Sequence, residues 1–141
     1  MNRKIDHILD SGILIRHLRD QKGYPELTDR LTDKGDVYIS AMTRLEIVRG
    51  MRDRERLKTF ELFESLDTIP ITAGIADLAG ELIRMWRERG MILSDADSII
   101  AATAINHGLA LVTTNAKHFP MPELTVFQAD EVGNIAPHKP T

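Results

Sequence analysis

The sequence contains no cysteine, which excludes a disulfide framework and any zinc site built on thiolates. It also has no basic excess, because its formal net charge of −3 excludes a generally basic coat for nucleic acid and leaves room only for a local basic patch. No apolar run approaches the length of a membrane span, and residues 5–7, after the basic start, do not form a signal-peptide core. We therefore expect a cytoplasmic protein without a membrane segment.

With 141 residues, the chain is long enough for one domain with a sizeable core. Hydrophobic residues make up 43% and charged residues 28%, which is typical of an ordinary globular domain. We predict a single domain over residues 1–128. Gly133, Pro137 and Pro140 predict that residues 129–141 form a frayed C-terminal tail.

Short apolar runs alternate with helical patterns along the chain. This alternation predicts an α/β fold, a three-layer sandwich in which a central parallel sheet is flanked by helices. Pro70 predicts that its strand lies at an edge of the sheet. Residues 53–66 have the spacing of an amphipathic helix with Leu57 in its apolar stripe. The predicted strands are residues 5–9, 37–39, 68–71, 109–113 and 124–127.

The helix predicted over residues 94–107 begins with an unusual pair of acids. Ser94 is a good N-cap, and Gly108 suits the left-handed residue that closes a helix. Asp97 lies in line with the apolar residues three, four and seven positions further on, so it faces the crevice beyond the strand ends. Asp95 could share an ion with Asp97 only from the incoming loop, because a regular helix turns it away. The alternative is that both acids merely complement the helix dipole.

Polar residues also follow three predicted strands. Asp10 stands at the carboxyl end of the first strand, where open α/β folds place catalytic groups, although it could simply cap the next helix. Glu46 follows the second strand and could instead complete a capping box with Thr43. Asn115 ends a later strand and could orient a water molecule or a phosphate. The carboxyl ends of parallel strands share one edge, so these side chains could converge.

Convergence of the acids would need a cation or raised pKa values. Two carboxylates about 4 Å apart repel by roughly 4 kcal/mol at an effective dielectric near 20, which exceeds the roughly 1 kcal/mol that a cap supplies. Ligand sets made only of oxygen select hard ions such as Mg²⁺ or Mn²⁺. A bound ion of this kind can activate water and stabilise a phosphate oxygen. The candidate ligands are Asp10, Glu46, Asp97 and Asp95.

Four segments of the chain, in this order, form a recognisable pattern: Leu9-Asp10-Ser11-Gly12-Ile13-Leu14-Ile15, Ser40-Ala41-Met42-Thr43-Arg44-Leu45-Glu46, Asp97-Ser98-Ile99-Ile100-Ala101-Ala102-Thr103-Ala104 and Leu111-Val112-Thr113-Thr114-Asn115. They resemble PIN-domain proteins, specifically the VapC-type toxins of toxin–antitoxin pairs. The resemblance covers residues 5–127 and implies a PIN fold, Mg²⁺- or Mn²⁺-dependent cleavage of RNA, a homodimer and a cognate antitoxin. It implies that Asp10 and Asp97 are metal ligands and that Glu46 is the third acid.

The sequence departs from the family pattern in two places. Gly12 lacks the polar side chain usual at that position, and His118 stands where many members carry a fourth acid. Both departures favour an alternative, a catalytically weak PIN-like module that dimerises and binds a partner. A third hypothesis is a metal-independent ribonuclease that uses His118 and Lys117 as acid–base groups. Arginines near Glu46 are candidates for RNA contact, namely Arg44, Arg49, Arg52 and Arg54.

Overall fold

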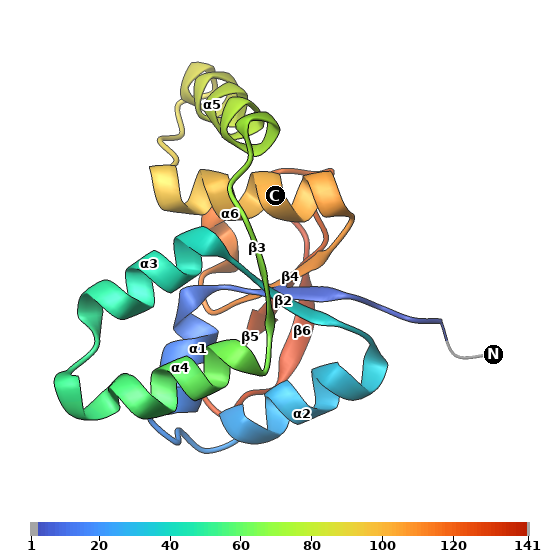
Figure 1. Cartoon of the computed structure of the whole chain (residues 1–141). Coiled ribbons are helices and arrows are strands. Elements are labelled where there is room, and N and C mark those ends of the chain that lie inside the picture. The colour runs from blue at the N-terminus through green and yellow to red at the C-terminus, as the bar shows by residue number, and fades with distance from the viewer. Residues whose placement is uncertain (1–2, 141) are drawn as a thin grey trace.

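The computed structural model describes residues 3–140 and has one six-stranded sheet at its centre (Figure 1). The strands are β1 (His7–Leu9), β2 (Val37–Ser40), β3 (Asp67–Ile69), β4 (Ala110–Thr113), β5 (Val126–Ala129) and β6 (Ile135–His138). The helices are α1 (Ser11–Leu18), α2 (Tyr24–Lys34), α3 (Ala41–Gly50), α4 (Arg56–Glu64), α5 (Ala73–Glu88) and α6 (Asp95–His107). Two short 3₁₀ turns are η1 (Asp53–Glu55) and η2 (Ala116–His118).

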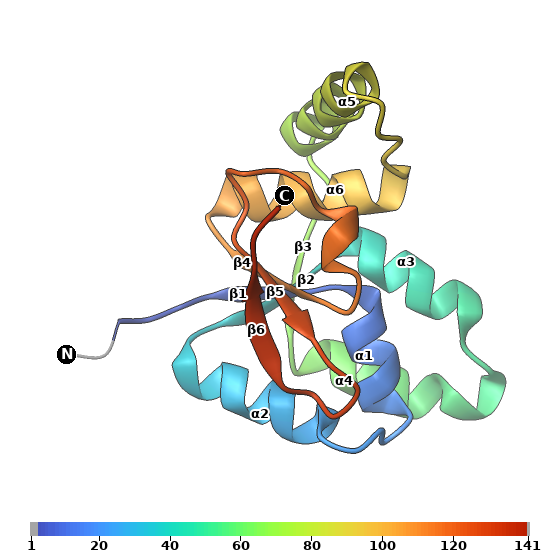
Figure 2. The same cartoon turned by 180° about the vertical axis from the view of Figure 1, so that it is seen from behind.

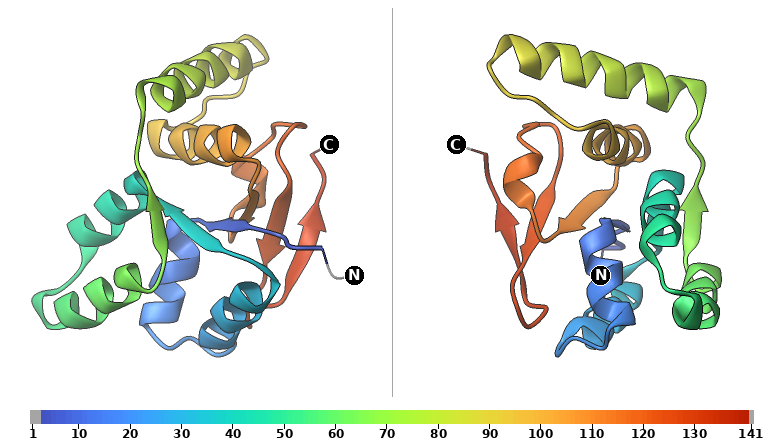
Figure 3. Two further views of the ribbon diagram at one scale, coloured as in Figure 1. Left: turned by 45° about the vertical axis from the view of Figure 1, so that its right-hand side comes forward. Right: turned by 90° about the vertical axis from the view of Figure 1, so that its left-hand side faces the viewer.

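The sheet has the order β3-β2-β1-β4-β5-β6, and every neighbouring pair is parallel except β5 and β6. Helix α6 lies on one face of the sheet, with α5 packed against the outer side of α6, while α1, α2 and α4 cover the other face (Figures 1, 2 and 3). The predicted three-layer α/β sandwich is therefore confirmed. The edge position predicted for residues 68–71 is also confirmed, because β3 pairs only with β2.

Alternation along the buried strands produces two cores. Successive side chains of a strand point to opposite faces, so strands covered on both faces are mostly apolar. In β1, Ile8 packs into the core under α5 and α6, and Leu9 packs into the core under α1, α2 and α4. In β4, Leu111 packs into the same core as Ile8, and Val112 packs into the same core as Leu9. The polar residues that end these strands are consequently held at one rigid edge of the sheet.

The prediction of a frayed tail after residue 128 is wrong. Residues 126–129 and 135–138 form an antiparallel pair in which Phe127 lies opposite Pro137. Proline is tolerated there because β6 is an edge strand. Gly133 has a φ of 78°, and its turn lies against Gly23 at the start of α2. The segment is ordered by pairing with the preceding strand β5 and by hydrogen bonds that Tyr24 and Arg30 of α2 donate to the carbonyl oxygens of Asp130 and Gly133, and local composition does not reveal these contacts with α2.

The capping box predicted for Thr43 and Glu46 is also wrong. Helix α3 follows β2 directly, and Ser40 is its N-cap, with the side chain accepting a hydrogen bond from the N–H of Met42 at 3.0 Å. Glu46 lies in the second turn, so capping does not explain its presence.

The single amphipathic helix predicted over residues 53–66 divides into η1 and α4, and Leu57 is 73% exposed rather than part of a buried stripe. Within residues 3–140, no helix is long and apolar enough to cross a bilayer.

Candidate functional site

Asp10 joins the end of β1 to the start of α1. It is the N-cap of α1, which confirms the cap, and it is only 7% exposed at the carboxyl end of β1, where its catalytic role stays a prediction. The backbone N–H of Ser11 donates to Oδ1 at 2.8 Å. The hydroxyl of Thr113, at the end of β4, donates to Oδ2 at 2.7 Å. Both oxygens of a buried carboxylate are thereby held in a fixed orientation.

Burial raises the pKa of Asp10 above its ordinary value, because the charged form loses its hydration. The hydrogen bonds from Thr113 and Ser11 oppose this rise, since they stabilise the carboxylate. The charge of Asp97 adds to the rise, and His118 reduces it. Asp10 therefore shares an electrostatic environment with Asp97 and His118, which lie 87 and 108 positions away in the sequence.

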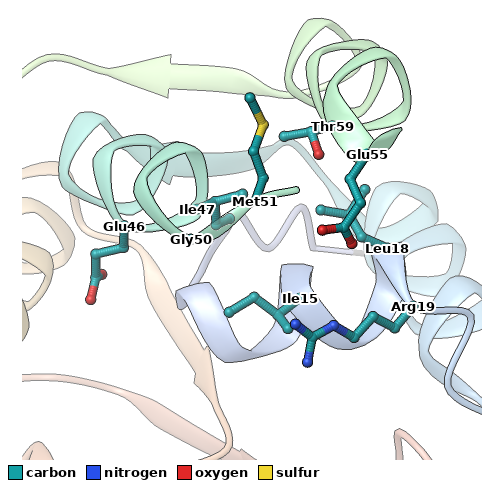
Figure 4. A pocket seen from close by; sticks show the side chains of 9 residues that line it. All are labelled: Ile15, Leu18, Arg19, Glu46, Ile47, Gly50, Met51, Glu55 and Thr59. Carbon is teal, nitrogen blue, oxygen red and sulfur yellow. The ribbon is translucent and has the colours of Figure 1, made fainter. Parts of the chain in front are cut away.

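Glu46 faces the same region from α3. Burial is the main cause that raises its pKa, followed by the charges of Asp10 and Asp97, while Arg49 and Ser11 oppose the rise. Its Oε1 atom is buried and has no hydrogen-bond partner among the described residues. The carboxylate points away from Met51 and Glu55, with which Glu46 lines a pocket between α1, α3 and α4 (Figure 4). It is therefore an under-satisfied acid whose pKa is raised by burial and by the charges of Asp10 and Asp97.

Asp97 comes to the site from the first turn of α6. Its backbone N–H donates to Ser94 Oγ at 3.0 Å, which confirms Ser94 as the N-cap. Its Oδ2 lies 3.5 Å from Nδ1 of His118 in η2, and the two side chains are 23% and 48% exposed. The imidazole thus lies beside the acids, at the position where the sequence departs from an expected fourth carboxylate.

The structure does not bring Asp95 to this group. Asp95 is the first residue of α6 rather than part of the incoming loop, and it is exposed. It is not among the charges that move the pKa of Asp10 or Glu46. Asn115 is exposed just beyond β4, and its backbone N–H donates at 3.0 Å to the same Thr113 hydroxyl that holds Asp10.

The ligand type at this site suits a hard divalent cation, because Asp10, Glu46 and Asp97 all offer carboxylate oxygens. Their arrangement is not that of a complete coordination site. Within residues 3–140, no three carboxylate or imidazole groups already lie close enough to form a ligand cluster. Burial and the charges of neighbouring acids nevertheless raise the pKa values of Asp10 and Glu46, and one buried oxygen of Glu46 has no hydrogen-bond donor. An ion between them would relieve both penalties, because carboxylate oxygens are preferred ligands of such ions.

Sequence reasoning missed the role of Thr113. Its side chain is fully buried and connects Asp10 to Asn115 through one hydroxyl. The only local signal was a threonine ending a buried strand, which is common and carries little information.

Of the arginines suggested for RNA contact, Arg44 stacks on Phe63 at 4.6 Å and donates to Thr68, so its side chain is engaged within the fold.

Comparison with known proteins gives a consistent picture. The PIN domain family matches residues 7–121. The chain is 34% identical over 115 residues to "Ribonuclease VapC19" of Mycobacterium tuberculosis, which covers 81% of this chain and 92% of that protein. It is 35% identical over 114 residues to "Ribonuclease VapC10" of the same species, with coverage of 81% and 86%.

Solved structures share the fold. The crystal structure of VapBC2 from Rickettsia felis, bound to a DNA fragment from its promoter, includes a similar chain with a TM-score of 0.78 and 23% identity, covering 89% of this chain and 100% of that one. A toxin–antitoxin complex from Klebsiella pneumoniae gives a TM-score of 0.70 and 26% identity, with coverage of 84% and 94%.

Proposed function

This chain belongs to the PIN-domain family and, within it, to the VapC-type proteins, and we propose that it is an endoribonuclease acting as the toxin of a toxin–antitoxin pair. The observation that carries the proposal is that three acids from separate elements gather at the carboxyl edge of the sheet, where burial and the charge of Asp97 raise the pKa values of Asp10 and Glu46. Ligands of open α/β folds bind at this edge. Glu46, a partly buried carboxylate with no capping role and one buried oxygen without a hydrogen-bond donor, is otherwise difficult to explain.

Cleavage is proposed to depend on Mg²⁺ or Mn²⁺ held by Asp10, Asp97 and Glu46. Such an ion lowers the pKa of bound water and stabilises negative charge on a phosphate oxygen. Thr113 keeps the Asp10 carboxylate oriented through its hydrogen bond to Oδ2. Ser94 holds the turn that carries Asp97. Asn115 is proposed to orient the attacking water or the phosphate, because it follows the strand that supplies Thr113.

The partners follow from the same assignment. RNA is the proposed substrate, and the partner protein is a cognate antitoxin, as in the complexes of similar chains from Rickettsia felis and Klebsiella pneumoniae. A homodimer is proposed as the active assembly. A cytoplasmic location is part of the proposal, since cellular RNA is the substrate.

One observation favours a second candidate, a catalytically weak PIN-like module that binds partners. Within the part of the chain that the structure describes, residues 3–140, no ready-made cluster of three metal-binding side chains exists. A calorimetric titration of the antitoxin-free protein with Mn²⁺ separates the two candidates. Saturable uptake that is lost in Asp97→Asn supports the nuclease, whereas no specific uptake by the wild type supports the module.

The deciding experiment is cleavage of a mixed RNA pool by purified protein shown to be free of antitoxin. Discrete cuts are expected with Mg²⁺ or Mn²⁺, none with a chelator, and none by Asp97→Asn. Asp77→Asn is the matched control, because Asp77 is an exposed aspartate of α5 away from the site. Cleavage retained by a folded Asp97→Asn protein would refute the assignment. Cuts that persist in chelator and fall on His118→Ala would indicate metal-independent chemistry instead.

A further inference from the structure

Gly12, two residues after Asp10, leaves a notch in the surface beside the acids. A Cβ atom at this position would lie 2.7 Å from Oγ1 of Thr114 and 3.3 Å from Nη1 of Arg16. The backbone of Gly12 is helical, so a side chain here would meet a steric contact rather than an unfavourable conformation. A hydroxyl group and a guanidinium group approach the same point, and a Cβ atom would force at least the hydroxyl to move.

Arg16 is held in place at this notch. Its Nη1 donates to the carbonyl oxygen of Gly12 at 3.2 Å, and its guanidinium lies 5.9 Å from the ring centre of buried Tyr24. None of the ion pairs among residues 3–140 involves Arg16. A guanidinium has five N–H donors, so most of them stay free for an incoming anion. The side chain is thus oriented and charged but has no acidic partner.

A pocket of about 300 Å³ opens beside the notch and is lined by Arg16, Thr114, Gln21 and Tyr24. Asp130 also lines the pocket, and its carboxylate already accepts hydrogen bonds from the N–H groups of Val132 and Asn134. Glu131 is a second acid in the lining. An anion is consequently expected beside Arg16 and Thr114, and Thr114 directly follows the residue that donates to Asp10.

We propose that Gly12, Arg16 and Thr114 form a subsite for a backbone phosphate of the RNA strand, next to the phosphate that is cut. The proposal rests on the proposed function and specifies how that site positions its substrate. Arginine and threonine side chains are regular partners of phosphate oxygens, and such contacts set the register of a strand without reading its sequence. Gly12 and Asp10 belong to one turn, so a strand anchored here lies beside the carboxylates.

The test measures affinity for an RNA fragment that the wild type cuts, with Asp97→Asn as the non-cleaving background. Arg16→Gln in this background is expected to weaken binding about 10-fold, as for loss of a charged hydrogen bond. The slope of log affinity against log salt should become shallower by about 0.7, the value for one lost phosphate contact on a single strand. Arg16→Lys should keep the slope. Arg84→Gln, which changes an exposed arginine of α5, should alter neither quantity.

Gly12→Ala tests the notch itself. It should weaken binding because the added methyl group displaces the Thr114 hydroxyl and crowds Arg16. Gly80→Ala is the matched control, since a Cβ there meets nothing within 4 Å. In the active protein, Arg16→Gln should raise KM with kcat nearly unchanged, as for a contact made equally in the ground and transition states.

The results of these experiments distinguish failure of the phosphate subsite from failure of the proposed nuclease function. If the wild type cuts RNA in a metal-dependent way but Arg16→Gln keeps its affinity and salt slope, the subsite is wrong and the nuclease stands. A lower melting temperature and lower kcat with an unchanged slope would show a structural role and also overturn the subsite. Weaker capture of the antitoxin with unchanged RNA affinity would assign the notch to the protein partner. If the wild type neither cuts nor binds RNA, both proposals fail.

Discussion

The hydrogen bond from Thr113 to Asp10 offers the sharpest test of how the site is held together. Thr113→Val keeps the shape of a fully buried side chain but removes the donor to Oδ2 and the acceptor for the N–H of Asn115. A hydrogen bond to a buried charge contributes about 1.5–3 kcal/mol, and an ordinary one contributes about 1 kcal/mol. Because Asp10 is only 7% exposed, solvent does not replace the lost donor. The free energy of unfolding should therefore fall by about 2–4 kcal/mol.

The loss should depend on pH in a defined direction. The pKa of Asp10 in the folded protein is above its unfolded value of 3.8, so the folded state binds more protons between those two values. The stability that Asp10 contributes is thus fully present below its unfolded pKa and is lost as pH rises through the folded pKa. The hydrogen bond from Thr113 lowers the pKa of Asp10 in the folded protein. Thr113→Val therefore has a higher folded-state pKa at Asp10 and loses more stability as pH rises. The difference in the free energy of unfolding between Thr113→Val and the wild type should be smallest in acid. It should be largest above the folded-state pKa of Asp10 in both proteins.

Urea unfolding in the presence of a chelator, repeated over a range of pH, measures this difference. Thr103→Val is the matched control, because that buried threonine donates at 2.7 Å to the carbonyl oxygen of Ile99 within α6 and touches no carboxylate. Its effect should be below about 1.5 kcal/mol and independent of pH. Equal losses for the two valine variants, or a loss at Thr113 that does not grow with pH, would refute the idea that the hydroxyl stabilises a buried charge.

Two further predictions concern the other acids. Glu46→Gln should raise the urea midpoint at neutral pH, because burial and then the charges of Asp10 and Asp97 disfavour the carboxylate, yet it should lower kcat for RNA cleavage by about 100-fold or more, as for loss of an acid–base group. A lower urea midpoint would contradict the inference that the charged Glu46 carboxylate destabilises the folded protein. Ser94→Ala should cost about 1 kcal/mol in unfolding free energy, because it removes the acceptor for the N–H of Asp97. It should also weaken Mn²⁺ binding in calorimetry, and unchanged affinity would mean that the cap does not position Asp97.

Local patterns in the sequence predicted the architecture because the interactions that encode it are local. Ser94 and Gly108 begin and end α6 as expected, since capping depends on residues within one turn. Alternating strands and helices predicted the parallel sheet, and polar residues at the strand ends predicted which edge carries the acids. Asp10 and Asp97 could be singled out in this way, because each lies at the boundary of an element that the sequence marks clearly.

Contacts between distant segments required the tertiary structure. The Thr113 hydroxyl meets Asp10 across 103 positions because β4 lies next to β1, a neighbour relation that no local pattern contains. Contacts over similar separations hold the turn before β6 against α2 and bring Thr114 into the space at Gly12. Composition and spacing determined which elements form and which residues end them. Sheet order and side-chain packing decided which of those ends meet.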